Sequence, residues 1–249
     1  MILAAKKSGA DSVKFQLWNP MKLKPGPWDK DGRRKIYERS YLDYKKFKLL
    51  YNFSKKNKID CFASIFSADE ILLHKKVNSK IVKIPSHESY NIKIIDECVK
   101  NFEYVLISLG ALKKDELIKI LKIVKQKKNL IPLHCVSAYP LNAEDTNFYK
   151  MNYISNYSKL FGYSGHMDSI NDAIYAINNG AKIIEKHFTI NKNLEGRDNK
   201  FALLPMQFKI LRDFADCFYD FKTKRTLDIQ KCELDIFKNY RGRWTKESS

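Results

Sequence analysis

Two histidines, His166 and His187, each lie at the end of a short apolar segment, and Glu185 stands two residues before the second. Neutral imidazoles are common ligands of divalent metal ions, and a site with few protein ligands leaves positions open for substrate or water. A single histidine is more often a hydrogen-bonded structural residue, so the interpretation rests on both together. The pair predicts a divalent metal site at His166 and His187.

Two lysines, Lys14 and Lys83, are each flanked by apolar residues. Because an unpaired buried ammonium group is costly, we expect both side chains to face a polar cavity. The alternative is that each extends along the outer surface and reaches solvent. Ammonium groups bind phosphates and carboxylates as point charges, so the pair predicts a site for a small anionic substrate. Gln16 lies two residues after Lys14 and shares its face of a strand.

Further polar side chains follow the other apolar segments. Glu88 is a candidate general base if burial raises its pKa, although a solvated surface carboxylate has the same sequence signature. Hydroxyl groups stand at the ends of most of the predicted strands, and we expect them to line the same cavity: Ser64, Ser86, Ser108, Ser137, Tyr139 and Ser164.

The elements that must position these residues alternate between short apolar segments and longer amphipathic, lysine-rich segments, the pattern of repeated βα units. Residues 19–35 and 142–156 are predicted loops, the second with one short helix. Asp168 or Ser169 is the expected cap of a helix that ends before Gly180. Strands are predicted at 12–17, 59–64, 80–84, 104–108, 130–136, 160–164 and 181–187, and helices at 2–8, 38–57, 68–76, 92–101, 113–128, 169–178 and 205–221.

This order of elements in 249 residues predicts an α/β protein of the TIM-type (β/α)8 barrel class, in which functional residues lie at the C-terminal ends of the strands. A barrel of this kind closes with eight strands, and the predicted strands are one fewer. We therefore expect the first β-strand to be lacking at the N-terminus, with the gap covered by another segment or the strand lying outside the sequence. Residues 1–222 are the predicted barrel and 223–249 a C-terminal tail.

The composition argues against nucleic-acid-binding, disulfide-rich and membrane-spanning proteins. A net charge of +18 raises the possibility of nucleic-acid binding, but only eight of the 46 basic residues are arginines, whose forked side chains read bases. We favour solvated helix faces and no nucleic-acid partner. Five cysteines without a CxxC motif fit a reducing cytoplasm, and no apolar segment has the length of a membrane span. We expect a cytoplasmic protein with no membrane partner.

Six strings now come together in order and spacing, and they resemble the sialic acid synthase family, which includes N-acetylneuraminate, legionaminate and pseudaminate synthases. The resemblance runs from about Ser8 to about Phe214, and six ordered motifs are far more specific than one. The strings are VKFQ (13–16), KIPSHE (83–88), LHCVSAYP (133–140), GYSGH (162–166), GAKIIEKHFT (180–189) and EGRDNKFALLP (195–205).

The resemblance implies a transferase of sialic acid biosynthesis that condenses phosphoenolpyruvate with an N-acetylated hexosamine aldehyde, giving a nine-carbon sugar acid and phosphate. It implies Mn2+ or Mg2+ at His166 and His187, polarising the aldehyde, and a homodimer or larger assembly. Lys14, Glu88 and Glu185 are then the expected catalytic residues, with Glu88 managing protons when water adds. Phosphoenolpyruvate would be held by Lys14, Lys83, Ser86, Ser137 and Ser164 and the sugar by Gln16, Tyr139 and Glu185; Ser64 and Ser108 join the substrate-binding set as strand-end residues.

The sequence departs from the family pattern at several points. The family's first strand, with its glutamate-bearing motif, and its C-terminal antifreeze-like domain have no counterpart in the 249 residues, and SIFS (64–67) and ISLGA (107–111) replace other turn sequences. Three alternatives therefore stay open: a truncated or inactive barrel that serves as a partner subunit, another metal-assisted aldol or isomerase enzyme, and a basic nucleic-acid-binding protein.

Overall fold

A computed structural model describes residues 1–221 and 227–244 of the chain. The chain divides into two compact units, Met1–Ala215 and Asp216–Ser249. The first unit contains the sheet and the predicted site residues, and the second contains the short helix α10 (Leu234–Asn239). No helix within the described ranges combines the length and the apolar character that a bilayer span requires.

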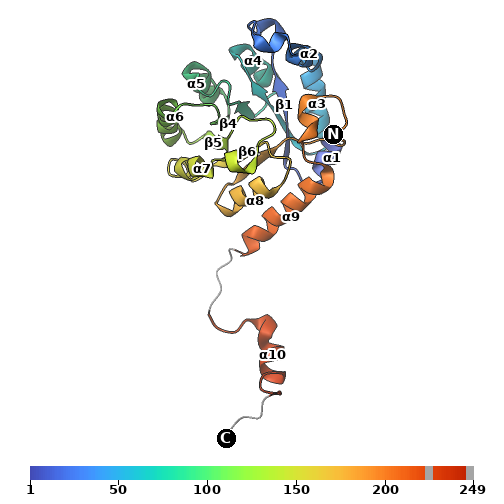
Figure 1. Ribbon diagram of the computed structural model, residues 1–249, viewed down its shortest axis with the longest axis vertical. Coiled ribbons are helices and arrows are strands. Elements are labelled where there is room, and N and C mark those ends of the chain that lie inside the picture. Colours follow the sequence, from blue (N-terminus) through green and yellow to red (C-terminus); the bar gives the residue numbers. More distant parts are fainter. Residues whose placement is uncertain (222–226, 245–249) are drawn as a thin grey trace. The chain divides into compact units, whose positions relative to one another are not determined.

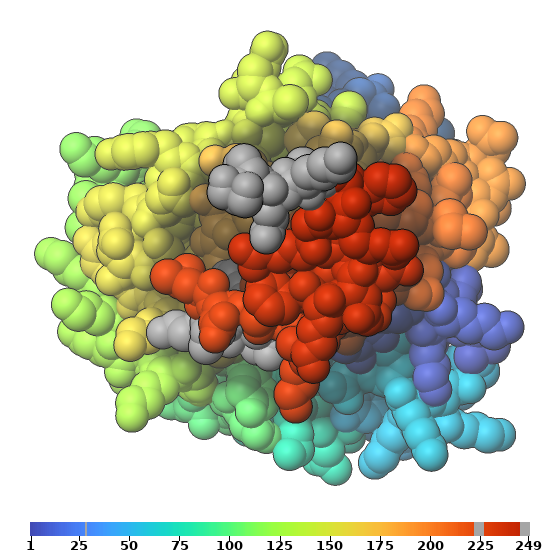
Figure 2. Space-filling view, turned by 90° about the horizontal axis from the view of Figure 1, so that it is seen from below, coloured from blue at the N-terminus to red at the C-terminus, as the bar shows by residue number. Residues whose placement is uncertain are grey.

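The sheet of the first unit has seven parallel strands that follow one another in sequence order and curl inside a ring of helices (Figure 1). Seen along a perpendicular direction, blue, cyan, green and yellow segments of this unit follow one another along its right, lower and left edges (Figure 2). The observed TIM-type arrangement is the predicted one. The strands are β1 (Ser12–Leu17), β2 (Asp60–Ile65), β3 (Ile81–Ile84), β4 (Tyr104–Ser108), β5 (Leu130–Cys135), β6 (Gly162–Gly165) and β7 (Ile183–Lys186).

Several helices of the first unit, among them α3, α5 and α6, have one apolar face whose residues are buried against the sheet. In α5, Ile94, Ile95 and Cys98 are buried on one side, and the Asn91 side chain caps the first turn. The other helices are α1 (Ile2–Lys7), α2 (Arg33–Arg39), α3 (Tyr44–Lys56), α4 (Ala68–Lys76), α6 (Lys114–Gln126), α7 (Phe148–Ser155), α8 (Asn171–Asn178) and α9 (Pro205–Phe221).

One predicted helix was wrong in its extent, and the start of another lies two residues later than predicted. The predicted helix 38–57 is broken: α2 ends at Arg39, and α3 begins at Tyr44 because the Asp43 side chain accepts a hydrogen bond from the Lys46 N–H at 2.8 Å and starts a new helix. The helix predicted from residue 169 begins at Asn171, since the Ser169 hydroxyl accepts from the Asn171 N–H before the first helical turn. Gly180, at φ +96°, follows this helix as predicted.

The residues that face the inside of the curled sheet form two layers. Phe62, Leu106, Ile131 and Leu133 pack together toward the N-terminal ends of the strands. One pleat further along most strands the inward residue is polar. Register pairs such as Ser64 with Lys83 and Ser164 with Glu185 place polar residues of neighbouring strands side by side. The inside of the curled sheet is therefore apolar toward the N-terminal ends of the strands and polar at their C-terminal ends.

The two outer strands, β1 and β7, each pair with one neighbouring strand among the described residues. Helix α9 follows β7 in the chain and reaches the start of β1, where Arg212 Nη1 donates to the Asp11 carboxylate at 2.8 and 2.9 Å. Gly9, at φ +87°, allows this approach, since a Cβ there would lie 2.6 Å from the Arg212 side chain. The ends of the strand series are thus linked through a helix.

Candidate active site

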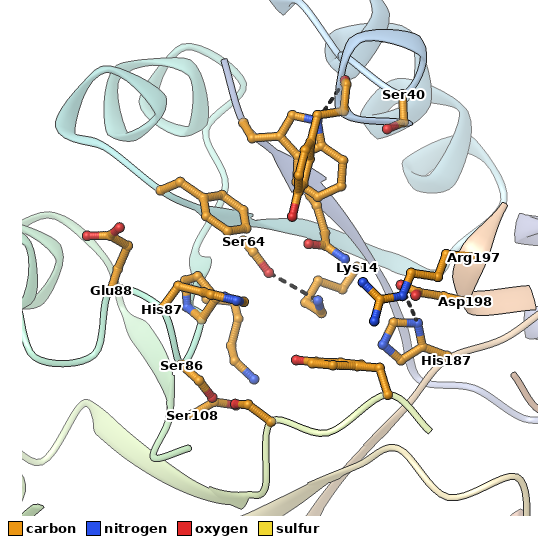
Figure 3. A pocket seen from close by; sticks show the side chains of 18 of the residues that line it. Lys14, Ser40, Ser64, Ser86, His87, Glu88, Ser108, His187, Arg197 and Asp198 are labelled. Atoms are coloured by element: carbon orange, nitrogen blue, oxygen red, sulfur yellow. Dashed lines mark hydrogen bonds and ion pairs between the residues drawn. The ribbon is translucent and has the colours of Figure 1, made fainter. Parts of the chain in front are cut away.

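A cavity of about 1190 Å³ opens at the C-terminal ends of the strands. Every site residue predicted from the sequence lines it, and Figure 3 shows side chains from several strands and loops directed toward a common space. The residues concerned are Lys14, Gln16, Ser64, Lys83, Ser86, Glu88, Ser108, Ser137, Tyr139, Ser164, His166, Glu185 and His187.

Glu185 of β7 lies between the two predicted lysines. Its carboxylate accepts a hydrogen bond from Lys83 Nζ at 2.9 Å, and Lys14 Nζ lies 3.7 Å away. The Ser164 hydroxyl donates to the other carboxylate oxygen at 2.9 Å, and Lys14 Nζ also donates to Ser64 Oγ at 3.0 Å. Strands β1, β2, β3, β6 and β7 therefore meet in one network of charges and hydroxyl groups.

The protonation of this network follows from burial and charge together. Burial alone raises the pKa of the Glu185 carboxyl, but the nearby ammonium groups of Lys14 and Lys83 outweigh it and hold that pKa below its usual value. Burial lowers the pKa of Lys83, whose side chain is only 2% exposed, and Glu185 partly offsets this effect. Two lysines facing one carboxylate leave an excess positive charge, which suits an anionic ligand.

His166 and His187 lie side by side, with 5.5 Å between their ring centroids. Nδ1 of His166 donates to the Val136 carbonyl oxygen at 2.9 Å, so its Nε2 keeps a free lone pair. Burial lowers the pKa of His166 to about 4 and that of His187 to about 3, so both rings are neutral at pH 7. Neutral imidazoles, one held by a backbone carbonyl, fit two ligand positions of a divalent ion.

The structure shows two imidazoles here rather than a complete set of protein ligands. Within residues 1–221 and 227–244, no group of three or more His, Cys, Asp or Glu side chains is spaced to hold a metal ion. Asp198 adds a carboxylate oxygen 3.5 Å from His187 Nδ1. A bound ion would therefore keep positions for substrate or water oxygens, as catalytic metal sites do.

Hydroxyl groups form the opposite wall of the cavity. Ser86 Oγ accepts a hydrogen bond from the Gly110 N–H at 3.2 Å. The Ser137 hydroxyl is buried and makes no hydrogen bond of acceptable geometry within the described part of the chain. A Cβ on Gly110 would lie within 2.6 Å of both hydroxyl oxygens, so a glycine is required there. A buried hydroxyl without a partner indicates a place for a polar ligand atom.

Glu88 is at the edge of this arrangement. Burial raises the pKa of its carboxyl, as a general base would require, but Figure 3 shows the carboxylate directed away from Lys14 and His187. The adjacent His87 points toward the cavity interior instead, and burial lowers its pKa. The structure therefore does not bring Glu88 together with the lysines and the two other histidines.

The sequence interpretation did not select several residues that line the cavity. Arg197 and Asp198 come from the loop after β7 and lie over His187 (Figure 3). Trp18 and Tyr37 come from the segment after β1, where Trp18 Nε1 donates to the Tyr37 carbonyl at 3.0 Å. The string EGRDNKFALLP contains Arg197 and Asp198, so a signal for these two was present, whereas none marked Trp18 or Tyr37.

The sequence of the chain is similar to those of known sugar-acid synthases. A profile described as the NeuB family matches residues 1–217. The chain is 32% identical over 226 residues to a pseudaminic acid synthase of Campylobacter jejuni subsp. jejuni serotype O:23/36 (strain 81-176), covering 85% of this chain and 66% of the relative. It is also 32% identical over 224 residues to an N-acetylneuraminate-9-phosphate synthase of Mus musculus, covering 82% of this chain and 61% of the relative.

The fold comparison agrees with the sequence comparison. An N-acetylneuraminic acid synthetase from Leptospira borgpetersenii serovar Hardjo-bovis, crystallised with citrate, superposes with a TM-score of 0.84 at 28% identity, covering 99% of this chain and 86% of that one. The matched region spans 66% of the length of the pseudaminic acid synthase and 61% of that of the N-acetylneuraminate-9-phosphate synthase.

Proposed function

Because the chain belongs to the NeuB family, we propose that it condenses phosphoenolpyruvate with an N-acetylated hexosamine aldehyde, giving a nine-carbon sialic-acid-type sugar acid and phosphate. One observation carries the proposal: Lys14, Lys83, Glu185, His166 and His187, far apart in sequence, face one cavity. The similarity to a pseudaminic acid synthase and an N-acetylneuraminate-9-phosphate synthase supports the same reaction class.

Phosphoenolpyruvate is assigned to the side of the cavity that holds the lysines and the hydroxyl groups. Its phosphate and carboxylate would meet the ammonium groups of Lys14 and Lys83, which bind anions without demanding one geometry. The buried hydroxyl of Ser137, together with those of Ser86 and Ser164, would donate to its oxygens, and the position of Ser137 and Ser86 around Gly110 on one side of the cavity supports this assignment. Ser64 and Ser108 complete the same wall.

His166 and His187 are assigned to a divalent ion, Mn2+ or Mg2+. When bound, such an ion supplies Lewis acidity toward the aldehyde oxygen of the acceptor. The neutral state of both rings and the free Nε2 of His166 support this role. Gln16, Tyr139 and Glu185 are assigned to the orientation of the sugar, since each lines the cavity near these imidazoles or the lysines.

The reaction balances with water as the third reactant. Carbon 3 of phosphoenolpyruvate forms a bond to the aldehyde carbon, whose oxygen gains a proton and becomes a hydroxyl group. Water adds at carbon 2, and the carbon–oxygen bond to the phosphoryl group breaks, which leaves a ketone and free phosphate. We assign proton transfer at the water-addition step to Glu88 on the resemblance and on its raised pKa, which suits a group that both accepts and returns a proton; the direction of its carboxylate, away from Lys14 and His187, does not support this assignment.

The test is a phosphate-release assay with phosphoenolpyruvate, a panel of acetamido hexoses and a divalent ion. Release is expected only when all three are present, and mass spectrometry should find a nine-carbon acid. Undiminished release in EDTA, or with no acceptor sugar, would contradict the proposal. We also propose that the protein is cytoplasmic and forms a homodimer or a larger assembly. Light scattering after size-exclusion chromatography measures the number of subunits.

A further inference from the structure

A buried ion pair that does not line the cavity lies directly behind the two histidines. Lys186 Nζ is 2.9 and 3.1 Å from the two carboxylate oxygens of Asp172, and their side chains are 1% and 0% exposed. Lys186 stands between Glu185 and His187 in the chain. Since side chains alternate along a strand, its neighbours face the cavity while Lys186 points outward toward α8.

Each group of this pair also holds a second element. Lys186 Nζ donates to the carbonyl of Met167, the residue after His166, at 2.9 Å. The Asp172 carboxylate accepts from the Tyr163 hydroxyl on β6 at 3.0 Å and from the Ala173 N–H in the first turn of α8 at 2.9 Å. Strand β7, strand β6, the loop after His166 and helix α8 are therefore joined at one point.

The packing around Gly165 shows how closely this cluster approaches His166. A Cβ on Gly165 would lie 2.4 Å from Asp172 Oδ2 and 2.5 Å from the Tyr163 ring. The residue immediately before His166 must therefore be glycine for the carboxylate to reach its place. The Asp172 carboxylate packs against Gly165, the residue before His166, and the Lys186 ammonium group binds the carbonyl of Met167, the residue after it.

Stability alone is a poor explanation for such a pair. Removing two charges from water is costly, and replacement of a buried ion pair by neutral residues of similar size is often neutral or stabilising. Groups that orient metal-binding histidines, in contrast, contribute strongly to metal affinity. We propose that Lys186 and Asp172 are positioning residues, which set the separation and orientation of His166 and His187 for a divalent ion.

This inference rests on the proposed function, and its test uses binding rather than turnover. In the double variant Lys186→Met, Asp172→Asn, Met keeps much of the length of Lys. Asn keeps one acceptor oxygen for the Ala173 N–H, and its amide N–H can donate to the Tyr163 hydroxyl oxygen in place of the second carboxylate oxygen. We expect a folded protein whose affinity for Mn2+, measured by isothermal titration calorimetry, falls about 10- to 100-fold. The matched control is Ile95→Val, a buried core change on α5 that lowers stability without touching the cluster.

The nitrogen chemical shifts of both imidazoles, measured by NMR without metal, form the second readout. Unchanged shifts and an unchanged Mn2+ affinity in the folded double variant would overturn the inference. If the unsubstituted protein does not bind Mn2+, the proposed metal site fails, and altered shifts of His166 and His187 still support the positioning role. Should the double variant not fold, Tyr163→Phe removes one bond to Asp172 and is expected to change both readouts in the same direction.

Discussion

Replacement of Glu185 by glutamine removes the negative charge between Lys14 and Lys83 while keeping the shape of the side chain. Lys83 is then a buried ammonium group without its carboxylate partner. Breaking one partner of a buried pair typically costs about 3 to 5 kcal/mol. Because the Glu185 side chain is 23% exposed, we expect the lower end of this range, about 3 kcal/mol of unfolding free energy at pH 7.

The pH dependence provides an internal check on this reasoning. The folded-state pKa of Glu185 is lowered, so its stabilising contribution is present above its ordinary pKa and is lost as the pH falls below it. The folded-state pKa of Lys83 is also lowered, so the unfolded chain binds more protons in alkaline solution and stability is regained as the pH rises. The deficit of the variant should therefore be largest near neutral pH and smaller at both extremes.

Urea unfolding followed by tryptophan fluorescence measures this difference. The matched control is Glu103→Gln, which breaks an exposed pair with Lys80 at a similar distance, 3.0 Å, where both side chains are largely accessible. An exposed pair contributes at most about 1 kcal/mol. If Glu185→Gln were no more destabilising than Glu103→Gln at pH 7, the interpretation of the buried network would be refuted.

Three further outcomes are expected. The double variant His166→Ala, His187→Ala should lose acceptor-dependent phosphate release at least about 100-fold while staying folded, and retention of activity would contradict the metal assignment. Burial lowers the pKa values of His74 and His134 to about 4, so the unfolded chain takes up protons first, and the urea midpoint should fall as the pH drops from 6.5 to 4; a constant midpoint would exclude this effect. Arg197 lies over His187, on the side of the cavity assigned to the acceptor rather than to phosphoenolpyruvate, so Arg197→Met should raise the KM for the acceptor sugar about 10-fold and leave that for phosphoenolpyruvate unchanged; Lys200→Met on the same loop, outside the cavity, should change neither.

Most of the fold was predictable because it depends on patterns that are local in sequence. The seven predicted strands lie within two residues of the observed ones, since short apolar runs and turn residues mark their limits. The break between α2 and α3 was missed, because residues 38–57 have a continuous helical composition and the interruption depends on a capping bond from Asp43. The helix at 148–155 was expected only as a short element within a loop, and α7 occupies that place.

The sequence by itself determined which side chains share a face of each strand: a spacing of two directs Lys14 and Gln16, or Glu185 and His187, to the same side. Only the tertiary structure decided what each side chain meets. That Glu185 lies between Lys14 and Lys83, that Val136 holds one nitrogen of His166, and that Lys186 turns back to Asp172 all depend on strand register and on the curl of the sheet. These contacts join residues up to 171 positions apart, and no local spacing encodes them.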